Sequence, residues 1–218
     1  MLTRLAITVL VSVTAATWAT MLWLRGAEVN PSYFAPFSVA VTVVSGLVFV
    51  LERWGWAWPG IRFLTRQPDL RGTWTAEIVS QLRGDENSLS TNDGFMVVRQ
   101  LLGSVHLRLL TRESQSLTLA ASITRESDGV YSIAAIYRNA PRLSVRAASP
   151  IHHGGLVLRI EGASLDRMSG EYWTDRETKG EIRLHRLTKR VVNDFDTARS
   201  LPTKSDLALK RRLVSQRV

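Results

Sequence analysis

The stretch from Gly72 to Leu82 reads GTWTAEIVSQL and is typical of the middle of this chain. Trp74, Ala76 and Ile78 stand at every second position, and more polar residues stand between them. Successive side chains of a β-strand point to opposite faces of the sheet. The alternation therefore predicts a strand with one buried and one exposed face.

Similar short segments recur up to residue 188. They are rich in β-branched and aromatic residues, and turn-forming clusters such as GDENS, TNDG and RETKG separate them. About eight antiparallel strands predict a closed barrel or a sandwich. A small closed barrel has room for its own side chains or for one small ligand. The expected strands lie within residues 72–82, 94–102, 104–112, 115–125, 129–138, 154–162, 168–174 and 180–187.

Two long runs without a charged residue precede the strands, from Leu5 to Leu24 and from Tyr33 to Leu51. At about 1.5 Å per residue, each run would form roughly 30 Å of helix, which is the thickness of a bilayer core. The aromatic cluster WGWAWPGIRF follows the second run, as in an interfacial belt. We therefore predict a membrane-anchored all-β protein with an N-terminal two-helix transmembrane hairpin. A cleaved signal peptide is the alternative for the first run.

The positive charges predict the orientation of this hairpin. The connecting loop carries only Arg25, at its edge, whereas several arginines flank the other ends. Both termini are therefore expected in the cytoplasm. The runs contain no acidic or basic side chain, which favours an anchor or a self-assembling element over a transporter. The expected domains are a two-span region at 1–66, a β-barrel recognition domain at 67–188 and a basic C-terminal tail at 189–218.

The net charge of +9 is unevenly distributed. Residues 67–188 hold 15 Lys+Arg against 14 Asp+Glu, whereas residues 189–218 hold 8 against 3. A domain that binds a nucleic-acid polymer would be expected to carry a basic stripe of its own, so we do not expect such a partner. The chain has no Cys, which excludes disulfides, thiolate zinc sites and thiol nucleophiles.

We find no pattern that predicts catalysis. GxGxxG, GxSxG and phosphate-loop motifs are absent. The histidines are His106, His152, His153 and His185, and they have no acidic partner at metal-ligand spacing. We therefore expect neither an enzyme, nor a metal site, nor a cofactor.

Polar side chains at the ends of several expected strands favour a binding site. The segments TRESQS, YRNAP, HHGG and SGEYWTDRETKG supply hydroxyl, amide and aromatic groups with few cations. Such groups suit bases and riboses, and a few positive groups would meet phosphate. The structural alternative is that Ser and Thr end the strands through turn hydrogen bonds. The candidate ligand-binding residues are Thr111, Ser114, Ser116, Tyr137, Asn139, His153, Tyr172, Thr174, Arg176 and Thr178.

These four motifs, placed after two N-terminal spans, resemble the membrane effector of CBASS anti-phage systems. The resemblance covers most of residues 1–188. It implies a minimal β barrel that binds a cyclic dinucleotide made by a cGAS-like nucleotidyltransferase during infection. It also implies self-association in the bacterial inner membrane, contact with membrane lipid, disruption of that membrane and abortive infection. The base identities, the number of subunits and the choice between a pore and general disruption stay open.

Two other functions stay open beside this one. A membrane-anchored, lipocalin-like barrel would bind a lipid or another apolar ligand, and its interior would be lined by Leu, Ile, Val and Phe. An interaction module would bind a protein partner and enclose nothing. The tail contains a possible short helix from Ser205, which is either a solvated terminus or a lipid contact through Lys210, Arg211 and Arg212.

Overall fold

The computed structural model describes residues 2–26, 34–81, 89–162 and 164–202. The chain divides into two compact units. One comprises Met1–Arg66 with Leu101–Gly103, and the other comprises Gln67–Gln100 with Ser104–Val218. Each unit is described by itself.

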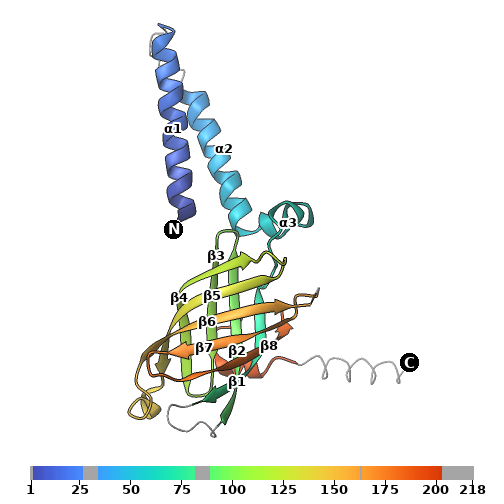
Figure 1. Ribbon diagram of the computed structural model, residues 1–218. Helices are drawn as coiled ribbons and strands as arrows, with labels where there is room; N and C mark the ends of the chain where they lie inside the picture. Colours follow the sequence, from blue (N-terminus) through green and yellow to red (C-terminus); the bar gives the residue numbers. More distant parts are fainter. Residues whose placement is uncertain (1, 27–33, 82–88, 163, 203–218) are drawn as a thin grey trace, which may run out of the picture. The chain divides into compact units, whose positions relative to one another are not determined.

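The second unit is a closed antiparallel barrel of eight strands in chain order, in which β8 pairs with β1 (Figure 1). The predicted β barrel is thereby confirmed, and the sandwich alternative is excluded. A short 3₁₀ helix, η3 (Leu143–Val145), lies between β5 and β6. The strands are β1 (Gly72–Gln81), β2 (Leu89–Leu101), β3 (Ser104–Leu110), β4 (Ser114–Arg125), β5 (Tyr131–Pro141), β6 (His152–Glu161), β7 (Arg167–Thr174) and β8 (Lys179–Thr188).

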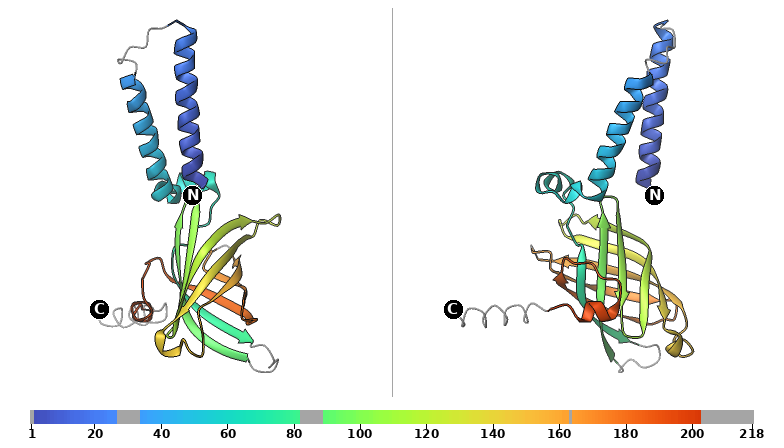
Figure 2. Two further views of the ribbon diagram at one scale, coloured as in Figure 1. Left: turned by 90° about the vertical axis from the view of Figure 1, so that its left-hand side faces the viewer. Right: turned by 180° about the vertical axis from the view of Figure 1, so that it is seen from behind.

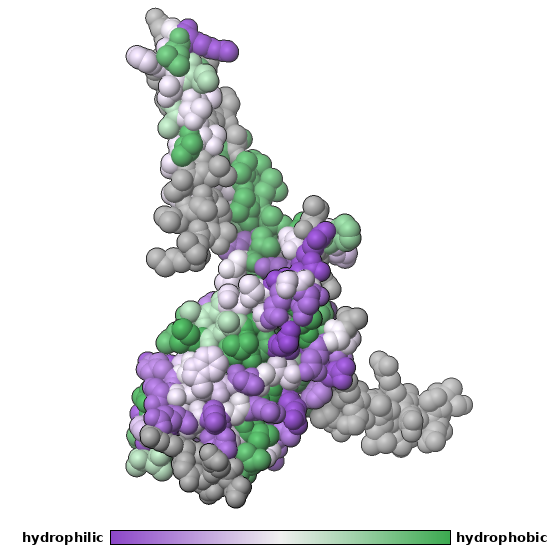
Figure 3. Space-filling model, viewed as in Figure 1, coloured by the Kyte–Doolittle hydropathy of each residue, from purple (hydrophilic) through white to green (hydrophobic). Residues whose placement is uncertain are grey.

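Alternate residues of each strand fill the barrel interior. On β1, Trp74, Ala76 and Ile78 are buried, as their spacing predicts. The interior also holds Leu158 and Leu184, and both are fully buried. Residues between these positions face outward, so the outer face mixes charged and apolar side chains (Figure 3). The barrel is therefore filled by its own side chains over much of its length, as expected for eight strands.

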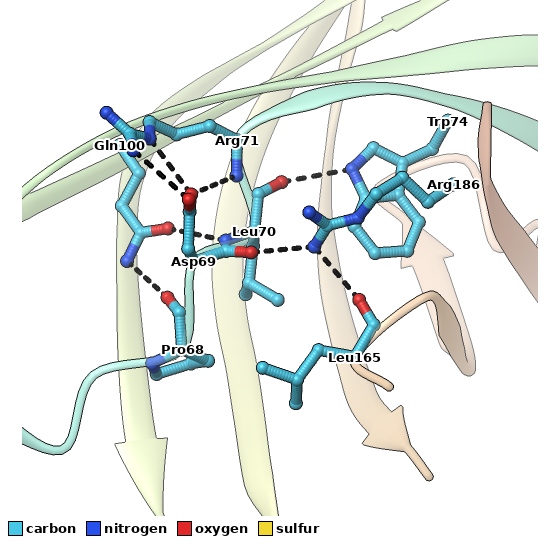
Figure 4. A network of polar contacts seen from close by, with 8 residues as sticks. All are labelled: Pro68, Asp69, Leu70, Arg71, Trp74, Gln100, Leu165 and Arg186. Carbon is cyan, nitrogen blue, oxygen red and sulfur yellow. Dashed lines mark hydrogen bonds and ion pairs between the residues drawn. The ribbon is translucent and has the colours of Figure 1, made fainter. Parts of the chain in front are cut away.

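One end of the barrel is closed by Trp74 and a network of polar contacts around it (Figure 4). The Trp74 indole N–H donates to the Leu70 carbonyl at 3.0 Å, and the Arg186 guanidinium lies 4.6 Å from the centre of the Trp74 rings. The buried Gln100 side chain donates to the Pro68 carbonyl and accepts from the Leu70 N–H. These contacts satisfy polar groups that would otherwise be buried without partners.

Asp69 completes this closed end. Arg71 donates two side-chain hydrogen bonds to its carboxylate, at 2.9 and 3.1 Å. Burial raises the pKa of Asp69, but the hydrogen bonds and positive charge of Arg71 outweigh burial and hold the pKa below its ordinary value. Asp69 therefore remains ionised at neutral pH.

The interior changes from apolar to polar toward the opposite end. On β1 the inward series runs from Trp74 through Ile78 to Ser80. On β5 it runs from Ile133 to Asn139. The same strands therefore provide both an apolar core and a polar chamber.

A segment after β8 packs on the outside of the barrel (Figure 2, right). Val192 and Ala198 are buried against Val97 and Leu110. A short helix, α4 (Phe195–Arg199), is capped by Asp194, whose carboxylate accepts from the Thr197 N–H at 2.8 Å. The helix expected from Ser205, with Lys210, Arg211 and Arg212, lies outside the described residues.

The first unit contains α1 (Leu2–Leu24), α2 (Phe34–Arg53), the 3₁₀ helix η2 (Gly55–Ala57) and α3 (Pro59–Thr65). In the described part of the chain, none of the helices has the length and apolar character needed to cross a bilayer. This finding overturns the predicted transmembrane hairpin. It also overturns the predicted multi-pass inner-membrane localisation with both termini in the cytoplasm.

Both helices also carry hydroxyl side chains that bond to the helix backbone. Hydroxyl residues recur along both helices. Thr17 and Thr20 donate to carbonyls one turn earlier on α1, and Thr42 does the same on α2. Such back-bonding to the preceding turn is common for Thr within helices.

Candidate functional site

The polar end of the barrel contains a cavity of about 590 Å³. This volume lies in the range of sites for small molecules. All eight strands contribute to its lining. The floor is apolar and includes Ile78, Met96 and Leu156, whereas the walls carry hydroxyl, amide and phenol groups. The cavity is therefore suited to a ligand with flat apolar surfaces and many polar atoms.

Two tyrosines enter this cavity opposite two glycines. Tyr137 on β5 pairs with Gly154 on β6, and Tyr172 on β7 pairs with Gly180 on β8. A Cβ atom at Gly154 would stand 2.6 Å from the Tyr137 hydroxyl, and one at Gly180 would stand 2.9 Å from the Tyr172 hydroxyl. Only glycine leaves room for the rings, so these pairs shape the chamber.

Both phenols are neutral at physiological pH. Burial raises the pKa of Tyr137 well above its ordinary value, and the nearby Tyr172 and Asp175 raise it further. Burial also raises the pKa of Tyr172, although a 2.5 Å hydrogen bond with Ser80 opposes the rise. Among the described residues the Tyr137 hydroxyl has no hydrogen-bond partner. It is therefore free to bond with a ligand.

A buried pair of polar side chains lines the wall between β4 and β5. The Ser116 hydroxyl donates to Asn139 Oδ1 at 3.0 Å, and Asn139 is 7% exposed. Asn139 Nδ2 has no partner within the described residues, so its two hydrogens are available to a ligand. Thr118 is also buried, but its hydroxyl accepts from the Leu107 N–H.

Four candidate residues stabilise turns at the rim. Thr111 and Ser114 hydroxyls lie 3.0 Å apart and hold the turn between β3 and β4. The Thr174 hydroxyl accepts from the Thr178 and Arg176 N–H groups in the turn after β7. The contacts of these threonines and of Ser114 are the turn hydrogen bonds by which Ser and Thr commonly end strands.

Charged side chains surround the mouth of the cavity, at the polar end of the barrel. Arg176 donates to the Ser149 hydroxyl at 2.9 Å, so it bridges the turn after β7 and the loop before β6. Arg112 lines the cavity from the turn after β3. Asp93 and Glu113 are also present, so the positive charge of the mouth is partly balanced.

The two adjacent histidines lie in different surroundings, one at the cavity and one at Asp175. His152 lines the cavity, and its ring lies 2.9 Å from the Pro150 carbonyl. His153, which the sequence analysis selected, does not line it. Its backbone N–H donates to Asp175 at 2.9 Å, and its ring lies 3.6 Å from the same carboxylate.

The cavity thus brings together every candidate ligand-binding residue except His153. Several lining residues were not candidates, and strand alternation would have found some of them. Ser80 is two residues beyond Ile78, Thr118 is two beyond Ser116, and His152 is two before Gly154. No sequence signal pointed to the distant Phe195, which also lines the cavity.

In residues 2–26, 34–81, 89–162 and 164–202, we find no cluster of three or more His, Asp or Glu that could hold a metal ion.

The fold and cavity define a small β barrel with a polar-walled cavity at one end. The chain belongs to the family described as Cap15, cyclic dinucleotide receptor domain, whose model matches residues 65–186. It is also similar to CD-NTase-associated protein 15 from Staphylococcus schleiferi, at 25% identity over 150 residues. That match covers 69% of this chain and 78% of the relative. The resemblance is thereby confirmed at the level of the receptor domain.

Proposed function

We propose that the barrel cavity binds a cyclic dinucleotide and that the protein is the sensing effector of an anti-phage defence system. Membership of the cyclic dinucleotide receptor family supports the ligand class. The name of the staphylococcal relative, which associates it with a CD-NTase, supports the link to a nucleotidyltransferase. We also propose that the domain is a receptor without catalytic activity.

The observation that carries this proposal is the chemistry of the cavity walls. Tyr137 and Tyr172 offer aromatic faces and neutral hydroxyls, and Asn139 offers amide hydrogens. Bases stack on aromatic rings and form hydrogen bonds through their edges. A lipid carrier would instead have apolar walls throughout. Tyr172 lies inside the barrel, packed against its core, which disfavours the lipocalin-like alternative.

The mouth is suited to the two phosphates of such a ligand. Arg112 and Arg176 stand on different turns around it, and His152 adds an imidazole ring. A charge-assisted hydrogen bond contributes about 1.5–3 kcal/mol. We propose that Arg176 binds a phosphate directly, because its contact with Ser149 already positions the guanidinium at the mouth.

Calorimetry of the full-length chain tests the proposal. The titrants are cyclic di-AMP, cyclic di-GMP and cyclic GMP–AMP, with linear pApA as the control ligand. We expect one cyclic dinucleotide to bind with micromolar or tighter affinity. Tyr172→Ala and Arg176→Ala should each weaken binding about 10-fold or more.

Trp173→Ala is the matched control variant, because Trp173 neighbours Tyr172 but is 51% exposed on the outer face. It should leave the affinity within about twofold. If the folded wild type binds none of the three cyclic dinucleotides, the proposed function is wrong. Equal losses in all three variants would show that the cavity is not the site.

The output of the receptor is a further part of the proposal. The family resemblance implies that ligand binding drives self-association, and a ligand can do so only if it binds the assembled state more tightly. Sedimentation velocity with and without ligand tests this step. A membrane-directed action rests on the resemblance alone. Ligand-dependent leakage of dye from lipid vesicles would support a membrane-directed action. Vesicles that stay sealed at saturating ligand would contradict it.

A further inference from the structure

The segment after β8 reaches the ligand cavity although it lies beyond residues 65–186, which the family model matches. Its contribution is Phe195, on the first turn of α4. The buried Val192 and Ala198 fix this segment against the barrel, and the Phe195 ring meets the Phe95 ring at a centroid distance of 5.5 Å and an angle of 61°. Phe195 is only half-buried. An anchored aromatic ring therefore remains accessible beside the cavity.

Strand β3 is shorter than β2 in the region where Phe195 packs on Phe95. A two-residue turn joins Leu101 to Ser104, so the last residue of β3, Leu110, falls opposite Phe95 on β2. In agreement, a Cβ at Gly94 would stand 2.8 Å from the Leu110 carbonyl oxygen. Residues 89–93 of β2 therefore extend beyond the end of β3 and are paired with β1. Asp93 on this extension and Arg112 in the turn after β3 line both the barrel cavity and a second hollow, and we call the place where the two hollows meet the side opening.

Arg112 and Phe195 flank this side opening. Both line the barrel cavity, and both also line a second hollow of about 460 Å³ on the outer face of β1, β2 and β8. Arg112 is exposed and makes no hydrogen bond to other described residues. Arg183 and Arg199 border the second hollow, together with Glu77 and Asp93. An aromatic ring and a guanidinium thus border both hollows at this opening.

We propose that Phe195 and Arg112 form a second half-site for the ligand, outside the barrel wall. One nucleotide occupies the chamber between Tyr137 and Tyr172, and the other passes through the side opening so that its base stacks on Phe195 and its phosphate meets Arg112. This inference rests on the proposed function and adds the C-terminal segment to the binding site. It predicts that the domain matched by the family model does not hold the whole site in this protein.

The test is calorimetry of the full-length chain with the cyclic dinucleotide that wild type binds most tightly among cyclic di-AMP, cyclic di-GMP and cyclic GMP–AMP. Phe195→Leu keeps the packing bulk and removes the aromatic face. We expect it to weaken binding at least about fivefold, the loss produced by removing a base-stacking ring. Phe195→Trp keeps an aromatic face and should bind within about threefold of wild type. Ligand should quench the fluorescence that this added indole contributes.

Leu201→Ala is the matched control, because Leu201 packs against the same outer core but does not line the cavity. It should bind like wild type. Unchanged affinity in Phe195→Leu would overturn the half-site and leave the proposed function standing. An equal loss in Leu201→Ala would also overturn it, since packing alone would then explain the effect. If wild type binds no cyclic dinucleotide, the proposed function and this inference fail together.

Discussion

Tyr137 on β5 lies directly across from Gly154 on β6, where a Cβ atom would come within 2.6 Å of the phenol oxygen. The barrel therefore contains a polar aromatic ring because a neighbouring strand has no side chain at the paired position. The same relationship joins Tyr172 and Gly180 across the chamber. In each pair, the missing side chain of the glycine leaves room for a tyrosine that lines the candidate site.

Gly154→Ala should destabilise the barrel and weaken ligand binding. The new methyl group would press on the Tyr137 ring and on the Trp173 carbonyl, and overpacking of this kind costs about 1–3 kcal/mol. Urea unfolding measures the loss. Gly60→Ala in α3 is the control, because nothing lies within 4 Å of a Cβ there. Equal stability of Gly154→Ala and wild type would contradict the close packing of this pair.

The pKa of Tyr137 predicts a loss of stability in alkali. Its pKa in the folded state is raised by burial, so the folded protein retains a proton that the unfolded chain has already released. The contribution is fully present below the unfolded pKa of about 10 and is lost as the pH rises toward the folded value. Thermal unfolding between pH 8 and 11.5 should therefore show a decline above about pH 10. Tyr137→Phe should flatten that decline. An unchanged slope in this variant would contradict the assignment of the decline to Tyr137.

Asn139→Asp should weaken the binding of an anionic ligand more than Asn139→Ala does. Both changes remove the amide hydrogens that face the cavity, but Asp adds a buried negative charge next to Ser116. We expect the Asp variant to lose affinity about 10-fold more than the Ala variant at neutral pH, and to regain part of it at pH 5. Calorimetry at both pH values measures this. Equal affinities of the two variants would place Asn139 outside the site.

Arg176→Ala should reduce the salt dependence of binding as well as the affinity. Removing a cation that meets phosphate lowers the electrostatic part of the binding energy, which salt screens. Titrations at 50 and 300 mM NaCl should show a smaller difference for the variant than for wild type. Arg159→Ala is the control, since Arg159 pairs with Glu126 and Asp128 on the outer face. A salt dependence that matches wild type would contradict a phosphate contact.

Gln100→Ala should affect stability and leave binding intact. The variant strands the buried Pro68 carbonyl and Leu70 N–H at the closed end of the barrel, which costs about 1–3 kcal/mol. Gln115→Ala, on an exposed glutamine of β4, should stay within about 0.5 kcal/mol of wild type. Urea unfolding compares the two variants. A large loss of affinity in folded Gln100→Ala would show that the closed end also controls the cavity.

The sequence alone determined most of the strands and their buried faces, but the TNDG segment, expected to be a turn, lies within β2 and pairs with β1. Alternation at Trp74, Ala76 and Ile78 is a local pattern, because the geometry of a strand sends every second side chain to the same face. Polar residues at the strand ends were visible for the same reason. The two N-terminal helices were also expected, but none of the described helices was found to cross a bilayer as predicted.

Only the tertiary structure decided which residues meet. His152 rather than His153 lines the cavity because the register of β6 fixes which face turns inward. Tyr137 and Gly154 are far apart in sequence, and their relationship exists only once β5 pairs with β6. Phe195 reaches the cavity because the segment with α4 packs on Val97 and Leu110 on the outside of the barrel. The sequence therefore set the chemistry available on each strand, while closure of the barrel selected the side chains that share one chamber.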